Sequence, residues 1–384
     1  MPPILRNLPL AALAVGFGVF CAGGRAKPVR RPPEDLRALL EPIRARHNLP
    51  ALAGAIVTEE GAVASAAVGV RKFGSEVPVT VDDQFHLGSD TKSMTATLIG
   101  MLVEEGKFRW DTTLAEALPD LAKTMQPAYR SVTLEQMLAH RAGFSGESWP
   151  KGKTFLDMHR LPGAPREQRR IYVETILREE PVAAPGSKYI YSNRSYAVAG
   201  AIAERIANVP WEALITRRLF KPLGMTTTGF GAMGTPGKID EPWQHTVVDG
   251  KPHPIEPGPL RDNPAVIAPA GTVHCSIGDW GRYIALHLRG AQGKRGLLRP
   301  ETIQKLHTQP YGDYGFGWIG TERGWGGGQV LTHAGSNNQN YAVVWMAPKR
   351  AFAVLAMTNE GGDEAAKACD EVSAALIGLH HNGR

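Results

Sequence analysis

The sequence predicts an α+β fold in which strands from the N-terminal and C-terminal parts of the chain form one antiparallel sheet, flanked by helices. Strand-like apolar runs separated by turn signals occur toward both ends, and helical periodicity dominates between them. The 384 residues, 43% hydrophobic and 21% charged, suit a globular protein with a substantial core. We therefore expect a single domain over residues 35–384, with an α/β part at about 35–85 and 265–384 and an inserted, mainly helical subdomain at about 86–264.

Residues 1–26 have the features of a secretory signal peptide, with an early cation at Arg6, an apolar run over residues 8–22, and small residues after it. The apolar run is shorter than a membrane span requires. We therefore expect a Pro/Arg linker over residues 27–34 and a mature chain that is periplasmic or secreted. An uncleaved N-terminal anchor and a lipoprotein attached at Cys21 are the alternatives.

The domain is predicted to begin with a helix over residues 34–49, in which leucines and an isoleucine are spaced three or four apart. Residues 51–74 contain two apolar runs around a Glu-Gly pair, which predicts a strand hairpin. Ser89 then opens a long helix that ends at Gly106, a residue type suited to a helix C-terminus.

Helical signals broken by loops extend from about Asp111 to Phe230, with Thr133 placed to cap one helix. The segment from Phe144 to about Arg170 is polar and basic and contains several Gly and Pro residues. We expect it to be a long loop that flanks the site, because loops of that length inside a compact domain are usually functional or flexible.

Near the C-terminus, Ser276 and Asp279 form a capping-box pattern before another helix. Three or four strands joined by Gly-rich or Pro turns are predicted over residues 315–359, and a final helix over about Glu364 to Leu379. The site is expected in the cleft between the α/β part and the helical subdomain.

Ser89 and Lys92 are a candidate nucleophile and base. A spacing of three residues at a helix start places both side chains on one face, and the free N–H groups of the first turn favour developing negative charge. A serine hydroxyl needs a base, and a lysine is a base only when neutral. Burial against an apolar helix face lowers the pKa of a lysine enough for that role. The alternative is an ordinary capping serine.

A second S-x-x-K match, Ser148 and Lys151, contains a proline and lies in the predicted loop. Because it lacks helical register, we interpret it as a chance match.

Two further motifs contribute candidate residues. Tyr191-Ser192-Asn193 lies on a turn before a helix, where the tyrosine can relay a proton beside a lysine whose charge favours phenolate. Asn193 is placed to donate to a substrate carbonyl or to fix Lys92. The alternative is a plain loop with an asparagine cap.

The third motif, His333-Ala334-Gly335, lies at the end of a predicted strand, where a small residue and a glycine let a substrate approach closely. The backbone N–H of Ser336 is expected to complete an oxyanion hole with that of Ser89. The alternative is an ordinary strand-end histidine.

The order of these motifs resembles the serine β-lactamase and penicillin-binding protein superfamily, and most of all its class C β-lactamase-like branch (peptidase family S12-like), which includes D-amino-acid peptidases, serine esterases and β-lactamase-related proteins. The resemblance covers nearly all of the mature chain. Further matching segments are FHLGSDTKSMTA, VTLEQMLAHRAGF, APGSKYIYSN, LFKPLGMTTTGF, APAGTVHCSIGDWGRY and YGFGW.

The resemblance implies a β-lactamase/transpeptidase-like fold and an acyl-enzyme mechanism. The roles that it implies are an acylated nucleophile at Ser89, its partner base at Lys92, a second base and proton relay at Tyr191, a substrate-orienting amide at Asn193, and site-lining residues at His333 and Gly335.

The third motif departs from the class C pattern, which usually has K-T-G where this chain has H-A-G. A lysine there supplies a fixed cation for the substrate carboxylate, whereas a histidine is mostly neutral at pH 7 unless its pKa is raised. The departure favours an exported serine hydrolase acting on esters or D-amino-acid amides and peptides. A true class C-type β-lactamase, a D,D-carboxypeptidase, and a non-catalytic protein that binds β-lactams or cell-wall fragments are the alternatives.

We expect a small-molecule or peptide substrate and no cofactor or metal, because the 12 histidines form no H-E-x-x-H grouping. The net charge of +6 includes Arg6 and Arg25 of the predicted signal peptide, and the remaining cations are scattered without interleaved aromatics, so no nucleic acid is expected. No later segment is apolar enough for stable membrane insertion. The sequence leaves open the oligomeric state and whether Cys275 and Cys369 form a disulfide.

Overall fold

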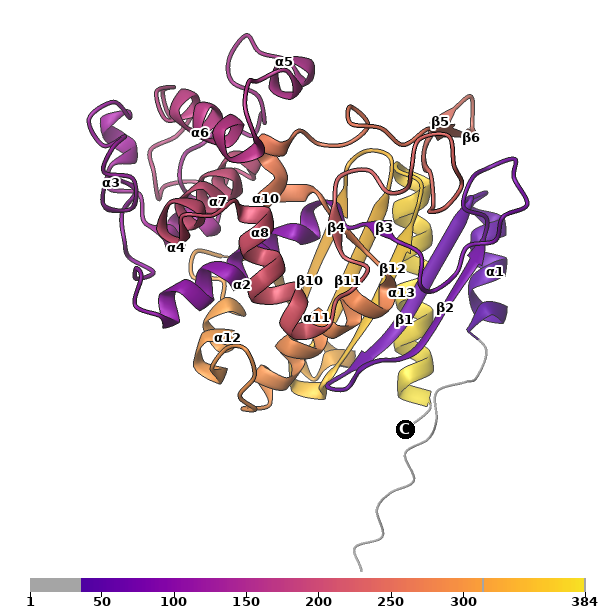
Figure 1. Cartoon of the computed structure of the whole chain (residues 1–384). Helices are drawn as coiled ribbons and strands as arrows, with labels where there is room; N and C mark the ends of the chain where they lie inside the picture. Colours follow the sequence, from indigo (N-terminus) through magenta and orange to yellow (C-terminus); the bar gives the residue numbers. More distant parts are fainter. Residues whose placement is uncertain (1–35, 313, 383–384) are drawn as a thin grey trace, which may run out of the picture.

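The computed structural model describes residues 36–312 and 314–382 (Figure 1). The predicted signal peptide and the linker lie outside the described residues. Within the described part of the chain, no helix combines the length and apolar character needed to cross a membrane.

An antiparallel sheet forms the centre of the α/β part, and it draws its strands from both ends of the chain, as predicted. In the described residues it has seven strands in the order β2-β1-β12-β11-β10-β9-β8. The predicted N-terminal hairpin is present, and Gly61 supplies the positive φ of +109° that its turn needs. The strands are β1 (Ala51–Thr58), β2 (Gly61–Gly69), β8 (Tyr314–Gly315), β9 (Trp318–Arg323), β10 (Gly328–Ser336), β11 (Tyr341–Ala347) and β12 (Phe352–Thr358).

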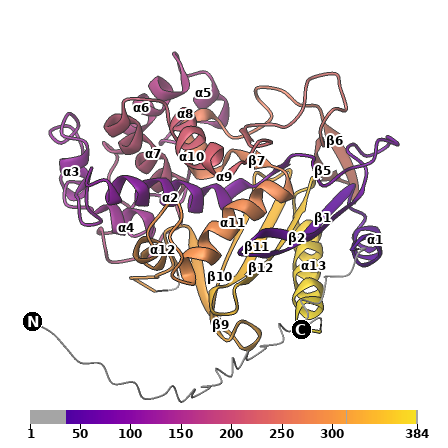
Figure 2. The same ribbon diagram turned by 60° about the horizontal axis from the view of Figure 1, so that its bottom comes forward.

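Both faces of the sheet are covered by helices (Figure 2). The helices α1 (Arg37–Arg46) and α13 (Asp363–Asn382) pack on one face, and α11 (Ile277–Ala291) packs on the other, against β1 and β2. Alternate side chains of the central strands therefore enter two separate apolar cores. Cys275 and Cys369 are both buried and both free, so the bridge that the sequence left open is not formed.

The middle of the chain is mainly helical and lies to one side of the sheet (Figure 1). Its helices are α2 (Thr91–Glu104), α3 (Leu114–Ala117), α4 (Leu134–Leu138), α5 (Phe155–His159), α6 (Pro165–Ile176), α7 (Asn193–Ala207), α8 (Trp211–Ile215), α9 (Lys221–Leu223), α10 (Ala268–Gly271) and α12 (Pro300–Leu306). Two small sheets accompany them, made of β3 (Phe85–His86), β7 (Val273–Cys275) and β4 (Gly229–Phe230), and of β5 (Gln244–Val248) and β6 (Lys251–Ile255).

The prediction of one long loop from Phe144 to Arg170 is wrong, because α5 and the start of α6 lie within it. A capping box begins α5. The Thr154 side chain accepts from the Asp157 N–H, and the Asp157 carboxylate accepts from the Thr154 N–H. Helix α6 begins with Pro165, whose fixed φ suits a first helical position.

The predicted capping box before α11 is only half formed. Ser276 caps the helix by accepting from the Asp279 N–H at 3.3 Å. The Asp279 carboxylate instead accepts from the backbone and hydroxyl of Thr227, both at 2.7 Å, and the Ser276 N–H donates to the Thr227 hydroxyl. A tertiary contact with Thr227 thus replaces the local one.

Candidate active site

The predicted site residues come from three segments that meet beside the end of β10. Ser89 lies in a 3₁₀ turn, Gly88–Asp90, directly before α2, so it precedes the α-helix that it was expected to open. Tyr191 precedes α7, and His333 lies in the last part of β10. The described register pairs β10 with β9 only as far as Thr332, so residues 333–336 lie beyond this pairing, and Gly335 packs closely against the turn that carries Ser89.

Lys92 is fully buried and is held by three hydrogen bonds. Its Nζ lies 3.0 Å from Ser89 Oγ, 2.7 Å from Asn193 Oδ1 and 2.8 Å from the carbonyl oxygen of Ala270. Burial lowers the pKa of Lys92 well below that of an ordinary lysine, and the nearby Asp90 opposes this effect. The side chain is therefore suited to exchange a proton with Ser89.

Tyr191 makes the second contact with Ser89, because its hydroxyl donates to Ser89 Oγ over 2.7 Å. Its ring packs on His140 with centroids 4.5 Å apart. Burial raises the pKa of Tyr191, so the phenol stays protonated and the expected preference for phenolate is wrong. The desolvation of a phenolate outweighs the nearby lysine, whose own positive charge is disfavoured by the same burial.

Asn193 connects Lys92 to a residue that the sequence interpretation set aside. Its carbonyl oxygen accepts from Lys92, and its Nδ2 donates to Ser148 Oγ over 2.9 Å. Ser148 is the serine of the second S-x-x-K match, and this hydrogen bond with Asn193 connects it to the site. The side chain of Lys151 takes no part in this contact. Ala270 was also missed, because only its backbone carbonyl takes part.

The backbone around Ser89 and Ser336 is packed too closely for side chains at two glycines. A Cβ on Gly335 would lie 2.6 Å from the Ser89 nitrogen, and a Cβ on Gly88 would lie 2.3 Å from the Ser336 nitrogen. Gly88 also has a positive φ of +50°. Both glycines therefore permit the two N–H groups to approach one position, which suits a pair of oxyanion donors.

His333 lies beside this group without contacting Ser89 directly. Its Nε2 hydrogen-bonds the hydroxyl of Tyr314 at 3.2 Å, and its Nδ1 lies 3.7 Å from a carboxyl oxygen of Asp90. Burial lowers the pKa of His333 to about 3, and the charge of Lys92 acts in the same direction. The third motif therefore supplies no cation at neutral pH.

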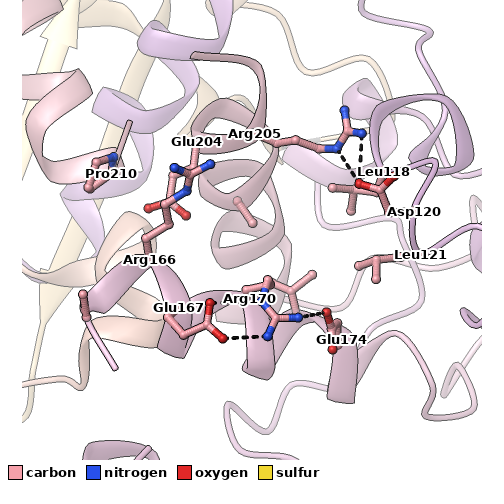
Figure 3. Close-up of a pocket in the computed structure, with 13 residues that line it drawn as sticks. Leu118, Asp120, Leu121, Arg166, Glu167, Arg170, Glu174, Glu204, Arg205 and Pro210 are labelled. Carbon is pink, nitrogen blue, oxygen red and sulfur yellow. Dashed lines mark hydrogen bonds and ion pairs between the residues drawn. The ribbon is translucent and has the colours of Figure 1, made fainter. Parts of the chain in front are cut away.

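A cavity of about 680 Å³ lies away from these residues, between α6 and the C-terminal end of α7 (Figure 3). Its apolar floor is rimmed by ion pairs of Arg205 with Asp120 and of Arg170 with Glu167 and Glu174. None of the predicted site residues lines this cavity. Arg205, on its rim, lies about three helical turns, or about 18 Å, along α7 from Asn193. Among residues 36–312 and 314–382, no group of three or more His, Cys, Asp or Glu side chains is placed to hold a metal ion.

The family model described as Beta-lactamase matches residues 36–377. The chain belongs to this family. It is accordingly an enzyme of the serine hydrolase class, with the β-lactamase/transpeptidase-like fold that the motifs implied.

Two curated relatives and one solved structure are similar to this beta-lactamase family member. Penicillin-binding protein 4 of Amycolatopsis lactamdurans is 26% identical over 334 residues, which cover 83% of each chain. Unguisins hydrolase ungD of Aspergillus violaceofuscus is 28% identical over 251 residues, which cover 62% of this chain but only 42% of the hydrolase. The octameric penicillin-binding protein homologue from Pyrococcus abyssi has a TM-score of 0.72 at 22% identity, covering 89% of this chain and 77% of the homologue.

Proposed function

We propose that the protein is an exported serine hydrolase that acts through an acyl-enzyme on esters or on D-amino-acid amides and peptides. One observation carries the proposal: Ser89 Oγ lies within hydrogen-bond distance of both Lys92 Nζ, at 3.0 Å, and the Tyr191 hydroxyl, at 2.7 Å. A nucleophile needs a base for its proton and a route by which that proton reaches the leaving group. These two neighbours of Ser89 offer both.

The surroundings of Lys92 suit a neutral amine. A neutral amine has two N–H groups and one lone pair, and Lys92 has two fixed carbonyl acceptors, Asn193 Oδ1 and the Ala270 oxygen, beside the serine hydroxyl. When both N–H groups donate to those carbonyls, the lone pair is left for the Ser89 hydroxyl. This arrangement favours proton transfer from Ser89 to Lys92 as the bond to the substrate forms.

The proposed reaction has two halves. Ser89 Oγ attacks the carbonyl carbon while its proton passes to Lys92, and the N–H groups of Ser89 and Ser336 stabilise the oxyanion. Tyr191, which is a phenol in the resting enzyme, donates its proton to the departing oxygen or nitrogen and then regains one from Lys92. Water then attacks the acyl-enzyme by the reverse proton route, which releases the acid and restores the Ser89 hydroxyl.

The neutral state of His333 supports the choice of substrate class. A β-lactam carries a carboxylate that a fixed cation at the third motif would bind, and the pKa of about 3 leaves His333 uncharged. Esters and amides without a carboxylate at that position lose nothing from its absence. A class C-type β-lactamase and a D,D-carboxypeptidase are the alternatives within the family.

Labelling with a fluorophosphonate probe, followed by peptide mapping, tests the nucleophile. We expect modification of Ser89 in the wild type and none in Lys92→Ala. Absence of labelling in a folded wild-type protein would contradict Ser89 as the nucleophile. Turnover of a short-chain nitrophenyl ester is expected to exceed that of nitrocefin, and rapid nitrocefin hydrolysis would reverse the proposed substrate class. N-terminal sequencing of the mature protein tests export, with cleavage expected near residue 26.

A further inference from the structure

The two proposed oxyanion donors belong to segments that are far apart in the sequence. The Ser89 N–H lies in the turn before α2, and the Ser336 N–H lies at the end of β10. Such donors work only when both lie about 2.7–3.1 Å from the developing oxyanion. Some part of the structure must therefore fix the separation of the two segments.

The first segment is held by a buried histidine. The Gly88 N–H donates to His86 Nδ1 over 3.0 Å, so Nδ1 is the acceptor and the ring proton lies on Nε2. That Nε2–H group donates to Asp262 Oδ2 over 2.9 Å. His86 is fully buried in β3, so this chain of hydrogen bonds is shielded from water.

The second segment is held by the other oxygen of the same carboxylate. Asn337 directly follows Ser336, and its Nδ2 donates to Asp262 Oδ1 over 2.8 Å. The same Nδ2 donates to Gln244 Oε1 over 2.6 Å, and the Asn337 Oδ1 accepts from Asn340 at 3.1 Å. The Asn337 side chain therefore has a fixed orientation on the Asp262 carboxylate.

We infer that Asp262 is a positioning residue that sets the spacing of the oxyanion donors by joining His86 to Asn337. The inference rests on the proposed function, since it concerns the site at which Ser89 would react. One carboxylate oxygen holds the residue before Ser89, and the other holds the residue after Ser336. Asp262 touches neither the nucleophile nor its base, so it acts only through the backbone of these two segments.

Asp262→Asn tests this inference with a minimal change of shape. The amide keeps an oxygen for His86 but turns an NH₂ group toward Nδ2 of Asn337, so two donors face each other. We expect kcat to fall about 10- to 100-fold, because a small displacement of catalytic groups has effects of that size. KM should change by about twofold or less, since ground-state binding makes little use of the oxyanion donors. The affinity for phenylboronic acid, which forms a tetrahedral anion on a reactive serine, should fall with kcat.

Asp279→Asn is the matched control, because Asp279 is also buried and its carboxylate also accepts two hydrogen bonds, both from Thr227. It should lower the melting temperature and leave kcat and the boronate affinity unchanged.

Wild-type kcat and boronate affinity in Asp262→Asn would overturn the inference. If Asp262→Asn does not fold, Asn337→Ala, at a half-buried position, carries the same expectations. Failure of the proposed function has a different signature, namely no labelling of Ser89 in the wild type. Labelling of the wild type together with full activity in Asp262→Asn refutes only the positioning role.

Discussion

The carboxyl group of Asp90 lies 3.7 Å from Nδ1 of His333, where the turn that carries Ser89 meets β10. Neither Nδ1 nor either Asp90 oxygen has a hydrogen-bond partner within the described residues. Burial raises the pKa of Asp90 well above its ordinary value and lowers that of His333 to about 3. Burial therefore disfavours the charged form of both groups, which weakens the anionic neighbour that would hold Lys92 protonated.

Asp90→Asn should preserve activity and extend it to lower pH. The amide resembles the protonated acid in shape and charge, so we expect at least about half of the wild-type kcat at pH 8. Any charge that Asp90 does carry raises the pKa of Lys92, so its removal should move the acidic limb of the kcat/KM profile to lower pH. A pH–rate profile of both proteins measures this shift. An acidic limb that moves to higher pH would contradict this effect of Asp90 on the pKa of Lys92.

Gly335→Ala should reduce activity by about 100-fold, because it disturbs a backbone donor of the oxyanion hole. The added Cβ would lie 1.9 Å from the Leu87 carbonyl oxygen and 2.6 Å from the Ser89 nitrogen, and backbone atoms cannot move aside as a flexible side chain can. Ester turnover and fluorophosphonate labelling should fall together. Gly378→Ala is the control, since its Cβ would meet nothing within 4 Å, and it should leave both rates unchanged.

The parts of the site that could be predicted are those with a local signature. Ser89 lies at a helix start and Gly335 near a strand end, so the local sequence made each a candidate, and the order of the motifs gave them a role through the family resemblance. Ser148 could not be found in this way, because its contact with Asn193 depends on how the segment around α5 and α6 folds. Ala270 contributes a carbonyl oxygen that every residue type has, although its segment, APAGTVHCS, was among those that resembled the family.

In the fold, too, local features could be predicted from the sequence and tertiary contacts could not. Periodicity and turn residues predicted the hairpin of β1 and β2 and the C-terminal strands, because these features depend on neighbours in the sequence. The role of Asp279 was only half predicted, since Thr227 comes from a distant segment. The protonation state of Tyr191 was beyond the sequence as well, because burial sets it, whereas the neutral state expected of a histidine at position 333 agrees with the structure.

Stability should fall as the pH is lowered from about 7 to 4, because several buried histidines stay neutral in the folded state. Burial lowers the pKa of each of them, to about 4 for His245 and His274 and to about 3 for His307 and His333. An unfolded histidine titrates near 6.5. Below that value the unfolded state binds more protons, so the free energy of unfolding decreases as pH falls. The residues are His140, His245, His274, His287, His307 and His333.

Urea unfolding at pH 7, 6 and 5 measures this effect. Each such histidine contributes up to about 1.4 kcal/mol per pH unit well below the unfolded pKa. His307→Asn should make the slope shallower by about one proton. An equal slope in the wild type and in His307→Asn would contradict the neutral state of the buried His307 imidazole, whatever the opposing contribution of buried carboxyl groups such as Glu360.

Ser148→Ala should lower kcat/KM, whereas Lys151→Ala should not, although the two residues form an S-x-x-K match. Ser148 Oγ accepts from Asn193 Nδ2, and this contact orients the amide so that its oxygen faces Lys92. Loss of one hydrogen bond of this kind costs about 1 kcal/mol, or about fivefold in rate if the whole effect reaches the transition state. Lys151 is exposed, and only its backbone N–H is engaged, with the carboxylate of Glu179. Steady-state ester kinetics of the two variants test this prediction. An equal loss of kcat/KM in Lys151→Ala and Ser148→Ala would mean that the second S-x-x-K match acts as a pair. Wild-type kcat/KM in Ser148→Ala would mean that Asn193 needs no support from Ser148.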